Sequence, residues 1–175
     1  TPIPRTLHQA LIGIKNISKI DTPPKLRKPI QTVISYFNWE AILFSIKREI
    51  TRNGQVYFLH NDINTLPFYH EKLSNFFPLL SIAIAHGKMK SKNLESVILS
   101  FFAGNIDILL CTTIIESGLD VANANTIIIN NAQNFGLSQL YQIRGRVGRS
   151  PRQAFCRLFV PRSEEHTSEL QSRTT

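Results

Sequence analysis

The sequence has little cysteine and no arrangement of ligands for a metal. It contains two cysteines, Cys111 and Cys156, and both lie within apolar runs. Such a pair indicates buried, reduced thiols in a cytosolic protein rather than a fold stabilised by disulfide bonds. The five histidines show no metal-binding spacing with cysteine or carboxylate side chains. The sequence therefore predicts a domain whose stability depends on a hydrophobic core.

Long apolar runs and acidic side chains are also scarce. No run is long enough to cross a bilayer, and the N-terminus lacks the layout of a signal peptide, so we expect no membrane partner. The sequence contains 12 Asp and Glu residues and 20 Lys and Arg residues, which gives a net charge of +8. This excess favours a polyanionic partner, although many basic proteins bind nothing acidic. With 42% hydrophobic residues, the chain can form one domain with a substantial core.

Short apolar runs alternate with segments of helical periodicity. This alternation predicts an α/β fold with a mostly parallel sheet, covered by helices on both faces. Residues 66–77 are a poor helix candidate because Pro67 interrupts them. The predicted strands are 29–37, 55–59, 81–85, 106–111, 126–130 and 154–160, and the predicted helices are 6–14, 39–52, 91–103 and 136–147.

Three arginines, Arg144, Arg146 and Arg149, lie within six residues and are separated by Gly145 and Gly148. A glycine inside a helix costs roughly 1 kcal/mol relative to alanine, so two of them favour a turn. The guanidinium group offers a fork of donors that matches phosphate oxygens. The pattern therefore predicts a phosphate-binding turn, and the alternative is a solvated basic helix end.

A second polar segment follows the apolar run at residues 106–111. Thr112 and Thr113 come directly after the run, and Gly118 and Asp120 follow within the next seven residues. This pattern is typical of a buried strand whose carboxyl end opens into a polar loop. Open α/β sheets bind ligands at that edge.

Together the two segments resemble the last two conserved motifs of superfamily 2 helicases and translocases. Residues 142–149 match the family pattern Q-x-x-G-R-x-G-R. Residues 1–7, 55–61, 85–89 and 135–140 resemble further motifs of one branch, which includes transcription-repair coupling factors and RecG-type branch-migration helicases.

The choice within this branch stays open at the level of sequence. Residues 20–24, 112–116 and 124–129 are more similar to the coupling factors, whereas residues 28–32 are more similar to the RecG type. For the first family, the resemblance implies an ATP-dependent double-stranded DNA translocase that displaces stalled RNA polymerase and recruits excision-repair proteins. For the second, it implies a helicase that remodels DNA forks.

The resemblance also implies a RecA-like fold and a nucleotide site shared between two motor domains. Arg146 and Arg149 would be the catalytic residues, reaching across a cleft to ATP held with Mg²⁺ mainly by the first motor domain. Gln142 would help to position the turn at the nucleotide cleft, and Gly145 and Gly148 would let the backbone pack closely. Gly118 and Asp120 would line the same cleft. Asp120 could instead be an ordinary loop carboxylate, and Arg144 a salt-bridge partner.

The nucleic-acid contacts implied by the resemblance lie at strand ends. They would bind the DNA backbone without reading its sequence, although a solvated loop is the alternative for the lysine. The residues are Thr112, Thr113, His86, Gly87 and Lys88. Arg5 belongs to a motif that couples the nucleotide state to the DNA grip. His60 and Asn61 also end a strand, and the resemblance gives them no clear role.

The chain is predicted to comprise three parts. Residues 1–28 would be the end of the first motor domain and a linker, and residues 29–161 the second RecA-like domain. Residues 162–175 resemble the translation of a sequencing-adapter oligonucleotide and are predicted to be a non-native, disordered tail. Because the sequence begins inside a motif, we expect Thr1 to be a cut end.

The sequence contains no G-x-x-x-x-G-K-[ST] phosphate loop. We therefore expect the chain alone to bind ATP poorly and to hydrolyse none. A different class of function, a stand-alone nucleic-acid-binding module without ATPase activity, is the alternative.

Overall fold

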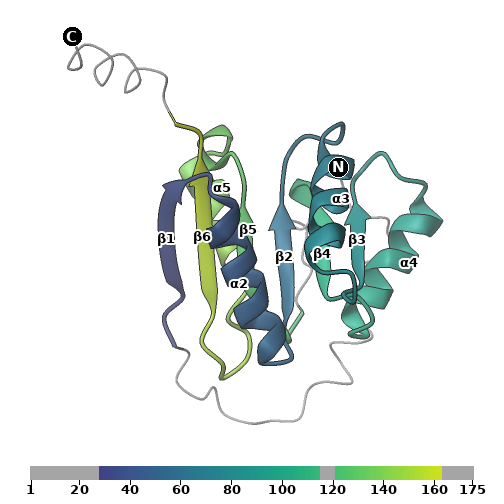
Figure 1. Cartoon of the computed structure of the whole chain (residues 1–175), viewed down its shortest axis with the longest axis horizontal. Coiled ribbons are helices and arrows are strands. Elements are labelled where there is room, and N and C mark those ends of the chain that lie inside the picture. Colours follow the sequence, from purple (N-terminus) through teal and green to yellow (C-terminus); the bar gives the residue numbers. More distant parts are fainter. Residues whose placement is uncertain (1–27, 115–120, 163–175) are drawn as a thin grey trace.

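A fully parallel sheet forms the centre of the molecule. The computed structural model describes residues 28–114 and 121–162, and within them the sheet has six strands in the order β1-β6-β5-β2-β4-β3 (Figure 1). The strands are β1 (Gln31–Tyr36), β2 (Gln55–Leu59), β3 (Ile82–Ala85), β4 (Ile108–Cys111), β5 (Ala124–Ile129) and β6 (Phe155–Val160). The α/β fold and the parallel sheet predicted from the sequence are confirmed.

Helices cover both faces of this sheet, as expected (Figure 1). Helices α2 (Trp39–Thr51) and α3 (Leu66–Phe76) pack on one face, and α4 (Ser91–Phe102) and α5 (Leu137–Arg144) pack on the other. A short 3₁₀ helix, η2 (Ala132–Asn134), precedes α5.

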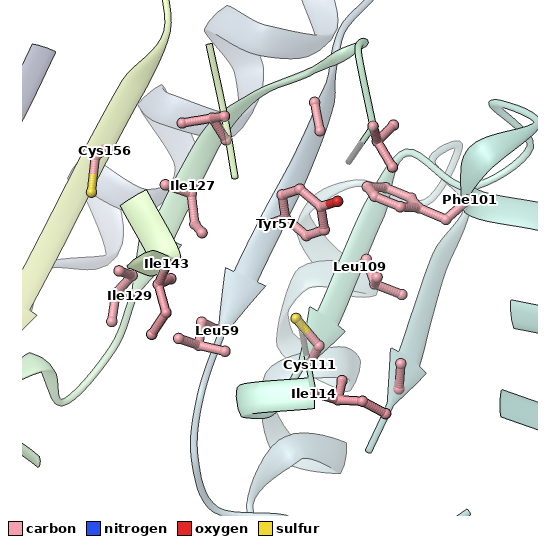
Figure 2. Packing of buried hydrophobic residues seen from close by; sticks show 14 of the residues in the cluster. Tyr57, Leu59, Phe101, Leu109, Cys111, Ile114, Ile127, Ile129, Ile143 and Cys156 are labelled. Carbon is pink, nitrogen blue, oxygen red and sulfur yellow. The ribbon is translucent and has the colours of Figure 1, made fainter. Parts of the chain in front are cut away.

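The central strands are mostly apolar because both of their faces are buried. In β2, Val56 and Phe58 point into the core under α2 and α3, whereas Tyr57 and Leu59 point into the core under α4 and α5. Figure 2 shows the second of these cores, with Ile143 of α5 beside Ile129 of β5.

Helix α2 begins and ends where its sequence predicts. The Asn38 side chain accepts hydrogen bonds from the backbone N–H groups of Glu40 and Ala41, at 2.8 and 3.3 Å. Asn53, just past the helix, adopts a left-handed conformation with φ of 59°, a common way to end a helix.

Helix α3 corrects the prediction for residues 66–77. Leu66–Phe76 forms a regular helix of 11 residues despite Pro67. The proline lies in the first turn, where its backbone nitrogen needs no partner within the helix and its fixed φ is already helical. Pro67 therefore begins the helix and does not interrupt it.

Candidate functional site

The predicted site residues occupy two opposite edges of the sheet. Thr112 follows β4 and His86 follows β3, so both lie at the carboxyl edge. Helix α5 runs back toward the amino edge and leads into the turn of residues 145–150, which precedes β6. The Ser150 hydroxyl donates a hydrogen bond of 2.7 Å to the side chain of Asn125 at the start of β5. The structure therefore separates the arginine turn from the threonines.

The arginine turn is anchored in the core by apolar side chains on either side of it. Ile143 is fully buried and Val147 is 2% exposed. The Gly145 N–H donates to the Tyr141 carbonyl at 3.1 Å, and the Arg146 N–H donates to the Ile143 carbonyl at 3.0 Å. These contacts place the turn directly after the last residue of α5.

Gly148 is the glycine that this turn requires. Its φ is +80°, a conformation that costs other residues roughly 1–2 kcal/mol. A Cβ at this position would also lie 3.3 Å from Ile30 Cγ1 and 3.4 Å from Ala154 Cβ. The predicted close packing is thus found at Gly148.

Gly145 differs from the prediction. Its φ is −66°, and a Cβ would lie 3.4 Å from two backbone carbonyl oxygens, an ordinary contact distance. The backbone does not approach another element closely there, because Gly145 simply ends α5 in a right-handed conformation that other residues adopt.

The side chains of this segment differ in exposure. Arg146 is half-buried, whereas Arg149 and Gln142 are exposed. The Arg144 guanidinium lies 4.8 Å from the ring centre of Tyr141, so a cation–π contact occupies it. The guanidinium groups of the turn thus lie at the protein surface, while the backbone that carries them is held in place by core contacts.

At the carboxyl edge, the structure brings two predicted segments together. Strands β3 and β4 are paired, with Ala85 opposite Cys111, so Thr112 and His86 emerge side by side. The Thr112 N–H donates to the Ala85 carbonyl at 3.3 Å. Thr112 is 8% exposed, Thr113, His86 and Gly87 are half-buried, and Lys88 is exposed. The neighbouring N–H, hydroxyl and ammonium groups suit a phosphate backbone.

Three predicted site residues, Arg5, Gly118 and Asp120, lie outside the described residues. Ile114 and Val121 are buried in the same core cluster as Ile143 of α5 and Val147 of the arginine turn.

A buried polar network at the carboxyl edge was missed at the level of sequence. His60 follows β2 and Asn130 follows β5, and they are 3% and 2% exposed. The Asn130 side-chain amide lies 3.1 Å from His60 Nδ1 and 2.8 Å from the Tyr69 hydroxyl. His60 Nε2 lies 2.6 Å from the Thr65 hydroxyl. The sequence pattern that could have revealed this network is a polar residue directly after a buried strand, which is also the pattern that identified Thr112.

The hydrogen bonds assign a neutral state to His60. Because the Asn130 NH₂ group donates to Nδ1, Nε2–H donates to Thr65. The Thr65 hydroxyl in turn lies 3.0 Å from a carboxylate oxygen of Asp62. Burial lowers the pKa of His60, and the Asp62 carboxylate opposes this effect. A charged imidazole would turn a second N–H toward the Asn130 amide.

The described parts of the chain offer no group of three metal-ligating side chains. Nor does any helix there have the length and apolar character needed to cross a membrane.

The chain matches known sequences over most of its length. Residues 38–151 match the family model described as "Helicase conserved C-terminal domain". The chain is 46% identical over 173 residues to the transcription-repair-coupling factors of Myxococcus xanthus, Buchnera aphidicola and Staphylococcus aureus. Each match covers 99% of this chain but only 14%, 25% and 15% of those proteins, respectively.

Solved structures show the same fold. RecG bound to a three-way DNA junction is 34% identical with a TM-score of 0.69, over 99% of this chain and 24% of RecG. Domain 2 of the DEAD-box helicase Mss116p, bound to an RNA duplex, is 22% identical with a TM-score of 0.60, over 83% of this chain and 60% of that one. The arrangement of six parallel strands is therefore RecA-like, and this chain belongs to the helicase conserved C-terminal domain family.

Proposed function

We propose that this chain is the second motor domain of an ATP-dependent double-stranded DNA translocase that couples transcription to DNA repair. The observation that supports this most is the 46% identity to transcription-repair-coupling factors over 173 residues. The parent displaces stalled RNA polymerase in the bacterial cytoplasm. Its polymerase and excision-repair contacts, like most of its first motor domain, belong to regions outside this chain.

The arginine turn is the nucleotide-facing part of this proposal. Two guanidinium groups on a turn tied to the core fit the negative charge of the ATP phosphates, which with Mg²⁺ are held mainly by the first motor domain. When bound there, ATP supplies the phosphoryl group whose transfer drives the motor. Arg146 and Arg149 stabilise the charge on that group, an effect worth roughly 10³–10⁵ in rate in other nucleotidases. Gln142 helps to orient the turn, and Gly118 and Asp120 line the cleft.

The carboxyl edge is the nucleic-acid-facing part. The hydroxyls of Thr112 and Thr113 and the backbone N–H of Thr113 bind DNA phosphates together with His86, Gly87 and Lys88. Such contacts position a strand without reading its sequence. The arginine turn and the DNA-binding residues lie at opposite edges of the same sheet. When the nucleotide cleft closes, this domain moves as one body and carries its DNA-binding residues with it. Arg5 couples the closing of the cleft to DNA binding.

The role of the arginine turn can be tested in the full-length parent. Arg149→Ala is expected to abolish DNA-stimulated ATP turnover while leaving DNA affinity nearly unchanged. Lys72→Ala, which removes one exposed positive charge from α3, is the matched control and should retain turnover. Turnover that survives Arg149→Ala would contradict the assignment. The 175-residue chain itself is expected to show no turnover.

A RecG-type branch-migration helicase is the second candidate, favoured by the 34% identity to RecG over 99% of this chain. The coding sequence upstream of Thr1 distinguishes the two. A polymerase-binding domain there supports the coupling factor, and a fork-binding wedge domain supports the RecG type. A start codon near Thr1 would favour a stand-alone binding module instead.

A further inference from the structure

Four arginines outside both predicted sites gather between the C-terminal end of α2 and β6. They are Arg48 of α2, Arg52 directly after α2, Arg152 before β6 and Arg157 within β6, and together we call them the arginine surface. Arg48 and Arg52 both lie close to the ring of Phe155 at the start of β6. Figure 1 shows α2 in front of the sheet and α5 behind it, so this surface and α5 lie on different faces.

Aromatic rings fix the positions of these guanidinium groups. The Arg48 Cζ lies 3.3 Å from the centre of the Phe155 ring and 5.7 Å from that of Phe44. The Arg52 Cζ lies 5.1 Å from the Phe155 ring centre. Arg157 lies 6.0 Å from the ring centre of Phe159. Rings and arginines therefore alternate across the surface, and the stacking reduces the conformational freedom that a ligand would otherwise have to restrict.

The positive charges of this surface are poorly compensated. Among the described residues, Glu49 is the one carboxylate paired with any of the four arginines, and it is fully buried. Its Oε2 already accepts hydrogen bonds from Arg52 at 2.6 Å and from the Thr126 hydroxyl at 2.5 Å. Burial and then the charges of Arg52 and Arg157 lower the pKa of Arg48. The positive charges of these arginines thus repel one another, and a bound anion would reduce this repulsion.

Donors also remain available on this surface. Arg52 donates to Glu49 and to the Gln153 carbonyl, and Arg152 donates to the Arg52 carbonyl. Within the part of the chain that the structure describes, the guanidinium groups of Arg48 and Arg157 donate no hydrogen bond and contact aromatic rings instead. Arg152 is exposed and Arg157 half-buried, so a ligand can reach both.

We propose that the arginine surface is a second binding surface for the phosphate backbone of DNA, separate from the carboxyl edge. The inference rests on the proposed function, which makes DNA the polyanion available to this domain. Arginines placed at the end of one helix and along one strand match a ligand whose charges repeat regularly, and contacts to phosphates position DNA without reading its sequence. The arginine surface binds the duplex on the α2 side of the sheet, and the residues at the carboxyl edge bind it at a second place.

The salt dependence of DNA binding by the 175-residue chain tests this proposal. Each phosphate contact that is lost reduces the slope of log K against log salt concentration by about 0.9. The double variant Arg152→Ala/Arg157→Ala should therefore lower the slope by about 1.8, and Arg157→Ala alone by about 0.9. The probe is a short fluorescent duplex of random sequence, followed by anisotropy. Circular dichroism melts establish that each variant is folded.

Three further variants make the test specific. Lys72→Ala removes one exposed charge from α3 and should leave the slope unchanged, because distant surface charges are screened by salt. The double variant Arg152→Lys/Arg157→Lys keeps the charge and should retain most of the slope. Lys88→Ala reports on the carboxyl edge. If Lys88→Ala lowers the slope and the arginine variants do not, the second surface is refuted while the proposed function stands.

Two other outcomes would also overturn the proposal. If the slope is the same for every variant, both the second surface and the DNA grip at the carboxyl edge are wrong. If poly-glutamate binds in a manner abolished by Arg157→Ala while the DNA slope is unaffected, the surface recognises an acidic protein segment instead.

Discussion

Replacing Gly54 with alanine is expected to destabilise the fold strongly, although Gly54 belongs to neither predicted site. A Cβ on Gly54 would overlap Oε1 of Glu49 and lie 2.6 Å from its Cδ and 2.9 Å from its Cγ. Glu49 is fully buried, and its other carboxylate oxygen binds Arg52 and Thr126. The alanine therefore has to displace a carboxylate that joins α2 to β5.

The size of the effect follows from those lost contacts. Breaking a buried ion pair costs about 3–5 kcal/mol because the remaining charge is left unpaired. In a domain of this size, 1 kcal/mol shifts the melting temperature by about 2–4 °C. Gly54→Ala should thus lower the free energy of unfolding by about 3–5 kcal/mol, measured by urea denaturation of the 175-residue chain. Gly145→Ala is the matched control and should change it by less than about 1 kcal/mol, because its φ and contacts suit alanine.

A double-mutant cycle tests the mechanism itself. If Gly54→Ala acts by displacing Glu49, then it should cost little more once Glu49→Ala has removed that side chain. The double variant should therefore be about as stable as Glu49→Ala alone. Additive effects, or a loss below about 1 kcal/mol for Gly54→Ala, would refute the reasoning.

Three further predictions concern the turn, the polar network and the thiols. Gly148→Ala should lower the free energy of unfolding by roughly 1–2 kcal/mol because the φ of Gly148 is +80°. In the parent it should also slow ATP turnover. An unchanged melting temperature and an unchanged turnover rate would contradict this prediction. Because the folded pKa of His60 is lowered, its contribution to stability is fully present above its unfolded pKa of about 6.5 and is lost as pH falls through the folded pKa. Urea denaturation at several pH values should show this loss in the unaltered chain and a smaller one in His60→Gln. Burial raises the pKa of Cys111 and raises that of Cys156 to about 12, so Ellman's reagent should react with neither at neutral pH unless urea is added.

Much of the fold could be read from the sequence because local patterns determine it. The apolar runs at 55–59 and 154–160 correspond to β2 and β6, and the periodic segments at 39–52 and 91–103 to α2 and α4. Strands buried on both faces are mostly apolar, so they can be recognised in the sequence without any knowledge of their partners. Among the described elements, α3 was misjudged at a single position, because the sequence pattern did not reveal that Pro67 lies in the first turn. The helix predicted over residues 136–147 ends at Arg144, before the two glycines.

The candidate site was predictable only in part. The spacing of arginines and glycines in residues 142–149 indicated a turn, and Gly148 does adopt the conformation that only glycine readily accepts. Its neighbour Gly145 looks equivalent in the sequence but has no special conformation. Which glycine is required depends on the approach of Ile30 and Ala154, and these residues come from other parts of the chain.

By itself, then, the sequence determined the α/β class, most element boundaries and the presence of a glycine-containing turn rich in arginine, since these follow from periodicity and residue type along short segments. Only the tertiary structure decided that the arginine turn and Thr112 lie at opposite edges of the sheet. It also decided that His60 meets Asn130, 70 residues away, and that Arg48 stacks on Phe155. Such pairs depend on strand order and helix placement, which arise from long-range packing and leave no local pattern.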